Sequence, residues 1–119
     1  MKTILIAGGY AKHPQGPAAF VLMHISGNRK PVVMSKVLQQ SMSKEAAEVQ
    51  GILYGLRDLI HPSDVVVVSG YLPRPGSWEK VIEYAKANGH TVSYSVANWF
   101  GDKGEMYLDA CKQAKALVS

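Results

Sequence analysis

Basic side chains and two adjacent aromatics are the residues of this sequence best suited to binding a polyanion. The basic residues fall in expected loops, turns and one helix start: Lys12, Arg29, Lys30, Arg74 and Lys80. His13 adjoins Lys12, and Trp99 and Phe100 stand together in an expected loop. Basic side chains contact phosphates, and exposed rings stack on any base. These residues predict a surface for nucleic acid or another partner; alternatively, the basic residues are solvated and the two aromatics cover the core.

Composition is compatible with such a surface and excludes several classes of protein. The chain has 119 residues, 47% of them hydrophobic and 18% charged, so we expect one globular domain spanning 1–119. Thirteen Lys and Arg against nine Asp and Glu give a net charge of +4, which permits a polyanionic partner without requiring one. A single cysteine, Cys111, excludes a disulfide framework and a multi-cysteine zinc site. Without an evident signal peptide or membrane span, the chain is predicted to be soluble and cytoplasmic.

The hydrophobic pattern predicts three strands in the first third of the chain. Residues 3–7 form a short apolar run that is expected to end at Gly8 and Gly9. Residues 18–25 and 31–37 are rich in strand-forming types, and the segment between them contains glycine and asparagine, which tolerate the positive φ of a hairpin. We therefore expect an antiparallel meander.

Helices and strands alternate in the rest of the chain. Ser43 is placed to cap a helix that Pro62 would stop, and Ser77 is placed to cap another. Residues 64–68 are a continuous run expected of a strand buried on both faces, and residues 91–96 alternate like a strand.

A third helix is expected after residue 101, where Asp102 and Glu105 have the spacing of a capping box. The predicted order is therefore βββαβαβα. This order favours an α/β fold with a mixed five-stranded sheet, flanked by helices that connect its parallel strands.

Four segments, in order, resemble the ribonuclease H-like family. Residues 7–17 resemble its first strand end and Asp-Gly-Ser…Asn-Pro-Gly-Pro-Gly-Gly loop, and residues 43–56 resemble its Glu-Leu-x-Ala-Ala-x-x-Ala-Leu helix. Residues 66–72 resemble the fourth strand, which ends Thr-Asp-Ser-x-Tyr in the family. Residues 104–110 resemble the Gly-Asn-x-x-Ala-Asp-x-x-Ala start of the final helix. The resemblance covers nearly the whole chain and implies a single ribonuclease H-like domain.

The resemblance also implies where metal ligands would stand. Family members hold two divalent ions with four carboxylates, whose charge offsets the repulsion between the ions. Glu48 matches the helix glutamate and Asp109 the last-helix aspartate, whereas the two strand aspartates fall on Gly8 and on Ser69 or Gly70. Because a glycine cannot bridge two metals, the chain resembles a degenerate member with no catalytic residues. Its two remaining carboxylates would be vestigial, with at most a weak site for Mg²⁺ or Mn²⁺ and no other cofactor.

Gly51 and Gly55 share a helix face with Glu48 and indicate a close approach to that face. Two glycines inside a helix cost about 1 kcal/mol each relative to alanine. Either the helix packs tightly on the sheet through these positions, or a ligand or partner surface lies beside Glu48.

These patterns lead to one preferred function and two alternatives. We expect a catalytically inactive ribonuclease H-like domain that binds nucleic acid or a protein, as an accessory or inhibitory factor of the kind a virus or mobile element encodes. One alternative is a divergent metal-dependent nuclease that uses Glu48 and Asp109 with a substitute ligand such as Asp102. The other is a pure protein-interaction module, whose binding would not depend on salt. Its exposed apolar patch would contain Trp78, Trp99 and Phe100.

Overall fold

Eight elements follow one another in the predicted order. The computed structural model describes residues 2–12, 16–27, 29–97 and 101–118. The elements are β1 (Lys2–Ala11), β2 (Ala18–Ser26), β3 (Val32–Leu38), α1 (Lys44–Arg57), β4 (Asp64–Ser69), α2 (Glu79–Ala87), β5 (Thr91–Val96) and α3 (Asp102–Val118). His13, Trp99 and Phe100 lie outside the described residues.

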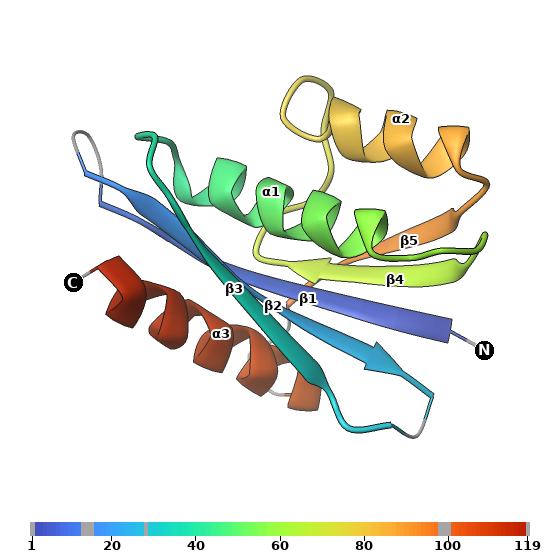
Figure 1. Cartoon of the computed structure of the whole chain (residues 1–119), viewed down its shortest axis with the longest axis horizontal. Coiled ribbons are helices and arrows are strands. Elements are labelled where there is room, and N and C mark those ends of the chain that lie inside the picture. The colour runs from blue at the N-terminus through green and yellow to red at the C-terminus, as the bar shows by residue number, and fades with distance from the viewer. Residues whose placement is uncertain (1, 13–15, 28, 98–100, 119) are drawn as a thin grey trace.

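The strands form one mixed sheet in the order β3-β2-β1-β4-β5 (Figure 1). β1, β2 and β3 make the expected antiparallel meander, with Thr3 opposite Ser26 and Ala11 opposite Ala18. β4 runs parallel to β1, and β5 runs parallel to β4. The mixed five-stranded α/β architecture predicted from the sequence is therefore confirmed. Parallel pairing also brings the carboxyl-terminal ends of β1 and β4 to the same end of the sheet.

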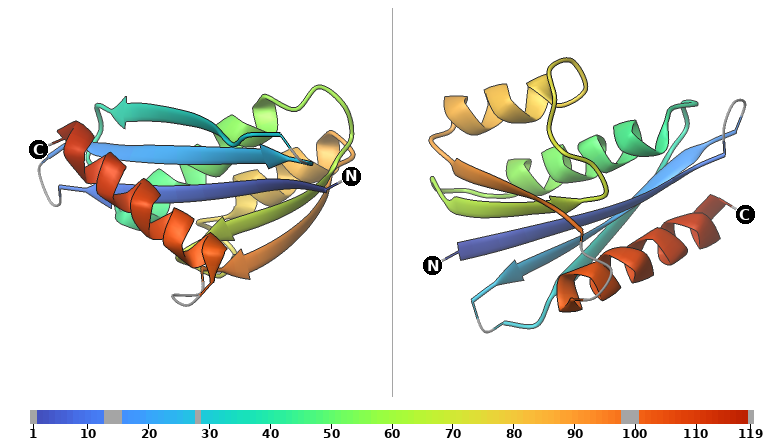
Figure 2. Two further views of the ribbon diagram at one scale, coloured as in Figure 1. Left: turned by 90° about the horizontal axis from the view of Figure 1, so that it is seen from below. Right: turned by 180° about the vertical axis from the view of Figure 1, so that it is seen from behind.

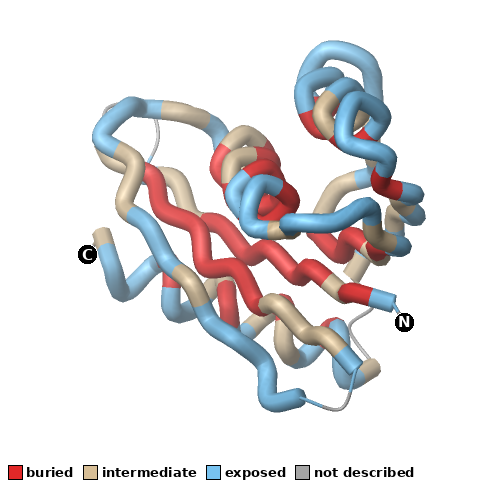
Figure 3. Tube along the Cα trace, turned by 45° about the vertical axis from the view of Figure 1, so that its right-hand side comes forward, coloured by how far each residue is buried: buried red, intermediate tan, exposed pale blue. Residues whose placement is uncertain are grey.

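Helices cover both faces of the sheet, α1 and α2 on one face and α3 on the other (Figures 1 and 2). Successive side chains of a strand point to opposite faces of the sheet, and this creates two hydrophobic cores. Leu5 and Ala7 of β1 pack with α1, whereas Ile6 packs with α3. The most buried backbone lies in the central strands, and the edge strand β3 is largely exposed (Figure 3). No helix in the described part of the chain is long and apolar enough to cross a membrane.

β1 continues through its two glycines, contrary to the expectation that it ends there. Ladder pairing with β2 extends to Ala11. A Cβ atom at Gly8 would lie 2.6 Å from Cβ of Ala110, and one at Gly9 would lie 2.8 Å from Cγ of Glu48. The glycines therefore allow α3 and α1 to approach the same strand from opposite faces.

The glycines of α1 serve helix-to-sheet packing. A Cβ at Gly51 would lie 3.0 Å from the Phe20 ring, and one at Gly55 would lie 2.8 Å from Leu22. The sheet itself therefore makes the close approach to this face that the sequence indicated.

Trp78 corrects two expectations about the segment before α2. Its side chain is fully buried in the core with α1, so it cannot belong to an exposed apolar patch. It is also the residue that precedes α2, and it makes no side-chain cap, whereas Ser77 was expected to cap this helix. The indole instead donates a 3.1 Å hydrogen bond to Glu45 of α1, which fixes the segment after β4 against that helix.

Candidate functional site

Glu48 is the centre of the most elaborate polar cluster in the described part of the chain. α1 begins after Ser43, whose hydroxyl caps it as predicted, and this places Glu48 within the second turn. Its side chain is fully buried. Oε1 accepts a hydrogen bond of 2.9 Å from the amide of Gly70. Oε2 accepts bonds from the amide of Gly9 at 3.1 Å, from Lys44 Nζ at 2.6 Å and from the Tyr107 hydroxyl at 2.7 Å.

Each of these donors comes from a different part of the fold. Because β1 and β4 are parallel, Gly9 and Gly70 lie at the same end of the sheet, where the carboxyl-terminal ends of both strands meet. Lys44 stands one helical turn before Glu48, and α3 supplies Tyr107 from the opposite face. The cluster therefore connects both layers of helices through the central strands.

The lysine and tyrosine of this cluster also contact each other. Lys44 Nζ donates to the Tyr107 hydroxyl, and it lies 4.9 Å from the centre of that ring and 5.6 Å from the centre of the Tyr71 ring. Burial lowers the pKa of Lys44, but its hydrogen bond to Glu48 and the charge of that carboxylate more than offset this effect, so the pKa is raised. Burial and the Glu48 charge raise the pKa of Tyr107. At neutral pH the cluster therefore holds an ammonium ion and a neutral phenol.

The residues present do not fit the divalent ions that the resemblance implies. Each carboxylate oxygen offers about two acceptor directions; Oε2 of Glu48 already accepts from three donors, and Oε1 accepts from the amide of Gly70. A Cβ at Gly70 would lie 2.2 Å from the Tyr107 hydroxyl, so the side chain of an aspartate has no room there. Within the described residues, no group of three or more His, Cys, Asp or Glu side chains could hold a metal ion.

Asp109 does not join Glu48, contrary to the expected vestigial pair. It lies on the exposed side of α3, where its carboxylate accepts a 2.9 Å hydrogen bond from Gln113. The buried side of α3 instead carries Tyr107, Ala110 and Ala114. Asp102, the substitute ligand considered for a nuclease, is exposed in the first turn of α3. The helix phase, with a period of about 3.6 residues, therefore presents a phenol to Glu48 where the resemblance implied a carboxylate.

The predicted basic residues do not form one patch. Lys12 follows β1 at one end of the meander, whereas Arg29 and Lys30 follow β2 at the other end. Nine residues of β2 separate these ends by about 30 Å at the usual rise per residue. Arg74 forms an ion pair with Glu45, and Lys80 is exposed on α2.

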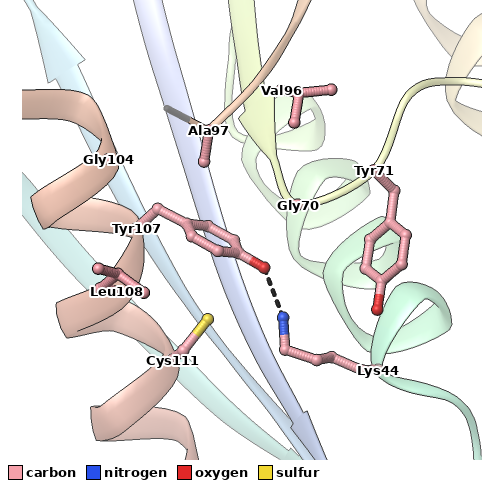
Figure 4. A pocket seen from close by; sticks show the side chains of 9 residues that line it. All are labelled: Lys44, Gly70, Tyr71, Val96, Ala97, Gly104, Tyr107, Leu108 and Cys111. Carbon is pink, nitrogen blue, oxygen red and sulfur yellow. Dashed lines mark hydrogen bonds between the residues drawn. The ribbon is translucent and has the colours of Figure 1, made fainter. Parts of the chain in front are cut away.

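Three residues that the sequence analysis did not single out complete the cluster and its surroundings. Lys44, Tyr71 and Tyr107 surround a pocket of about 350 Å³, which also reaches the carboxyl-terminal end of β5 (Figure 4). Cys111, the single cysteine of the chain, is partly exposed and lines the same pocket. Only the spacing of Lys44 and Glu48, one helical turn apart, was visible as a local signal.

Solved structures of ribonucleases H match the chain over nearly its full length. LC11-RNase H1, in complex with an RNA/DNA hybrid, matches with a TM-score of 0.72 and 15% identity over 97% of this chain and 99% of that chain. The N-terminal RNase H domain of a Mycobacterium tuberculosis protein matches with a TM-score of 0.61 and 16% identity, over 96% and 98% of the two chains. RNase H1 from the archaeon Halobacterium salinarum gives 0.60 and 12%, over 99% and 95%. No protein-family model or curated protein sequence matches the chain.

Proposed function

Because the chain has a ribonuclease H-like fold but surrounds Glu48 with its own donors, we propose that it binds nucleic acid without cleaving it. The single observation that carries this proposal is the set of four donors around Glu48, in which Lys44 supplies a positive charge next to the carboxylate. A protein of this fold, LC11-RNase H1, was solved with an RNA/DNA hybrid, which supports a hybrid as the first ligand to test.

The chemistry at the strand ends supports the proposed absence of hydrolysis. Two-metal cleavage needs anionic ligands that hold both ions at the phosphodiester. The residues at the corresponding strand positions are Gly8, Ser69 and Gly70, which carry no charge. Lys44 would repel a cation brought next to Glu48. The chain therefore lacks two of the four carboxylates that two-metal catalysis uses in the family, and we expect it to bind nucleic acid without a divalent ion.

The proposed interface lies at the carboxyl-terminal end of β1. Lys12 directly follows this strand, and Lys44 contributes to the cluster that includes Gly9. Lys115 of α3 lies with Nζ 5.9 Å from the centre of the Tyr10 ring near the end of β1. Three basic side chains from a strand end and two helices thus gather around one end of the sheet. Arg29 and Lys30 lie at the other end, outside this interface.

Two double variants that remove equal charge test this placement. A labelled RNA/DNA hybrid is titrated in EDTA at several salt concentrations. We expect Lys12→Ala with Lys115→Ala to weaken binding and to reduce the slope of log K against log salt by about 1 to 2. Arg29→Ala with Lys30→Ala also removes two positive charges, and it should leave that slope close to the wild-type value. An equal loss of affinity and of salt slope in both double variants would overturn the proposal, as would the absence of hybrid binding by the wild type.

A protein that covers a hybrid without cleaving it would act as an accessory or inhibitory factor. Bound protein excludes an active nuclease from the same phosphates, so addition of this chain should slow cleavage of the hybrid by an unrelated ribonuclease H. The Lys12→Ala, Lys115→Ala variant should protect less than the wild type at the same concentration. Protection that is identical in both proteins would contradict an inhibitory role based on this interface.

A further inference from the structure

The pocket beside Glu48 is not explained by binding to a duplex surface. Its volume of about 350 Å³ falls within the usual range for small-molecule sites. The end of β4, the end of β5, α1 and α3 each contribute to its wall. None of the described residues that line it is acidic. The pocket can therefore accept an anionic group without a facing carboxylate.

Lys44 provides a positive charge in the pocket wall. Its side chain is 38% exposed, whereas its partner Glu48 is completely buried, so a ligand meets the ammonium and not the carboxylate. Glu48 and Tyr107 use two of the three N–H groups of the ammonium among its described contacts. One N–H remains for an oxygen of a ligand. A phosphate group matches this donor.

The rest of the wall suits a flat apolar ring. The Tyr71 ring lies on the pocket side of Lys44, and Val96 and Leu108 add aliphatic surface (Figure 4). Aromatic side chains stack on nucleobases with little dependence on sequence, and apolar side chains pack against the faces of unpaired bases. An ammonium next to an apolar wall thus matches a ligand that joins a phosphate to an aromatic base.

We propose that this pocket binds one unpaired nucleotide, with its phosphate at Lys44 and its base against Tyr71 and Leu108. This inference rests on the proposed function and specifies which part of a nucleic acid enters the fold. A base inside a duplex is stacked on both sides and cannot enter such a pocket. The ligand is therefore a phosphorylated strand end or a free mononucleotide, two sources of the same chemistry.

Cys111 gives a direct probe of occupancy, because it lines the pocket and is the sole cysteine of the chain. The experiment measures the rate of Cys111 alkylation by iodoacetamide with increasing 5′-AMP, adenosine, inorganic phosphate or a 5′-phosphorylated oligonucleotide. We expect 5′-AMP to slow alkylation in a saturable manner, with adenosine and inorganic phosphate each much weaker. Protection by the oligonucleotide as well assigns a strand end, and protection by 5′-AMP alone assigns a free nucleotide. No protection by either phosphorylated ligand overturns the proposal.

Tyr71→Leu is the variant that tests the base contact while leaving the Glu48 cluster intact. The Tyr71 side chain makes no hydrogen bond to Glu48, so its replacement preserves the donors from Lys44 and Tyr107. We expect the 5′-AMP concentration that gives half-protection to rise about tenfold, as loss of one stacking ring implies. Lys86→Met on α2 is the control away from the pocket and should match the wild type. Equal half-protection concentrations in Tyr71→Leu and the wild type overturn the proposed base contact.

Hybrid binding separates the two proposals. If a hybrid still binds in a salt-dependent way while 5′-AMP and the oligonucleotide fail to protect Cys111, the pocket proposal fails and the proposed function stands. If no nucleic acid binds and no ligand protects, both fail. If 5′-AMP protects but no nucleic acid binds, the pocket proposal holds for a free nucleotide and the proposed function fails.

Discussion

The ammonium of Lys44 lies 2.6 Å from Oε2 of Glu48, one turn further along α1. A fully buried carboxylate is strongly unfavourable unless opposite charge and hydrogen bonds compensate it. In this protein the compensation comes from Lys44, Tyr107 and two backbone amides. Glu48 is thereby a structural acceptor that connects the two helical layers, and its charge is balanced from within the chain.

Replacement of Tyr107 by phenylalanine should reveal the contribution of its hydroxyl to the cluster. The change removes one donor to buried Glu48 and one acceptor for Lys44 while retaining the ring. We expect the free energy of unfolding to fall by about 1–3 kcal/mol, as measured by urea denaturation. Tyr54→Phe, at a 45% exposed position, is the control and should change it by less than about 0.5 kcal/mol. Similar effects of the two variants would contradict this role for Tyr107.

Introduction of an aspartate at Gly70 should destabilise the fold through a clash with Tyr107. A Cβ at Gly70 would lie 2.2 Å from the phenolic oxygen, so the ring must move. We expect Gly70→Asp to lower the free energy of unfolding by about 1–3 kcal/mol. The penalty should be smaller when Tyr107 is already alanine, which a double-mutant cycle measures. Gly101→Asp, at a position where a Cβ meets no atom of the described residues within 4 Å, is the matched control. An equal penalty with and without Tyr107 would contradict the clash.

Glu45 should contribute more to stability through Trp78 than through Arg74. Its carboxylate accepts from the buried Trp78 indole and pairs with Arg74, whose side chain is 65% exposed. Exposed ion pairs contribute at most about 1 kcal/mol, so Arg74→Ala should have an effect within that limit. Glu45→Ala leaves the buried indole N–H without this acceptor and should cost about 1–3 kcal/mol. A larger loss in Arg74→Ala than in Glu45→Ala, measured by denaturation, would reverse this ranking.

Stability should decline above about pH 10, because the folded protein holds protons that the unfolded chain releases. The pKa values of Lys44 and Tyr107 are raised from their ordinary values of 10.5 and 10.0. Below pH 10 both states keep these protons, and the full contribution is present. At higher pH the unfolded state binds fewer protons, so the free energy of unfolding decreases as pH rises. Urea titrations at pH 8 to 11 should show that the free energy of unfolding declines less steeply with pH in Tyr107→Phe than in the wild type. Identical pH dependence in the two proteins would contradict a raised pKa of Tyr107 in the folded state.

Periodicity was sufficient to predict the order of elements, because both strand and helix patterns are local. Ser43 was correctly identified as a cap. Glu48 was predicted as a vestigial metal ligand, and its four hydrogen-bond donors from within the chain were not foreseen. The end of β1 was misplaced, because glycine commonly breaks a strand. At Gly8 and Gly9 the absence of a side chain instead serves the packing of two helices on one strand.

The candidate site could be predicted only in part, because its contacts are distant in sequence. Tyr107 and Lys44 are 63 positions apart, and no local pattern connects them. Asp109 matched a motif by spacing, but the rotation of α3 leaves it in solvent with Gln113. Trp78 occupies a helix start where an exposed ring was expected, yet the packing of α2 on α1 buries it. Helix rotation and packing between distant elements decided these outcomes.

Binding without catalysis is tested most directly by titration of a labelled RNA/DNA hybrid with the wild-type protein in EDTA, Mg²⁺ and Mn²⁺ at matched ionic strength. Each lane reports both the mobility shift and the integrity of the hybrid. The predicted result is the same Kd in all three conditions, with the hybrid intact throughout. Cleavage in Mn²⁺ that disappears in Glu48→Gln would contradict the account and make the chain a metal-dependent nuclease.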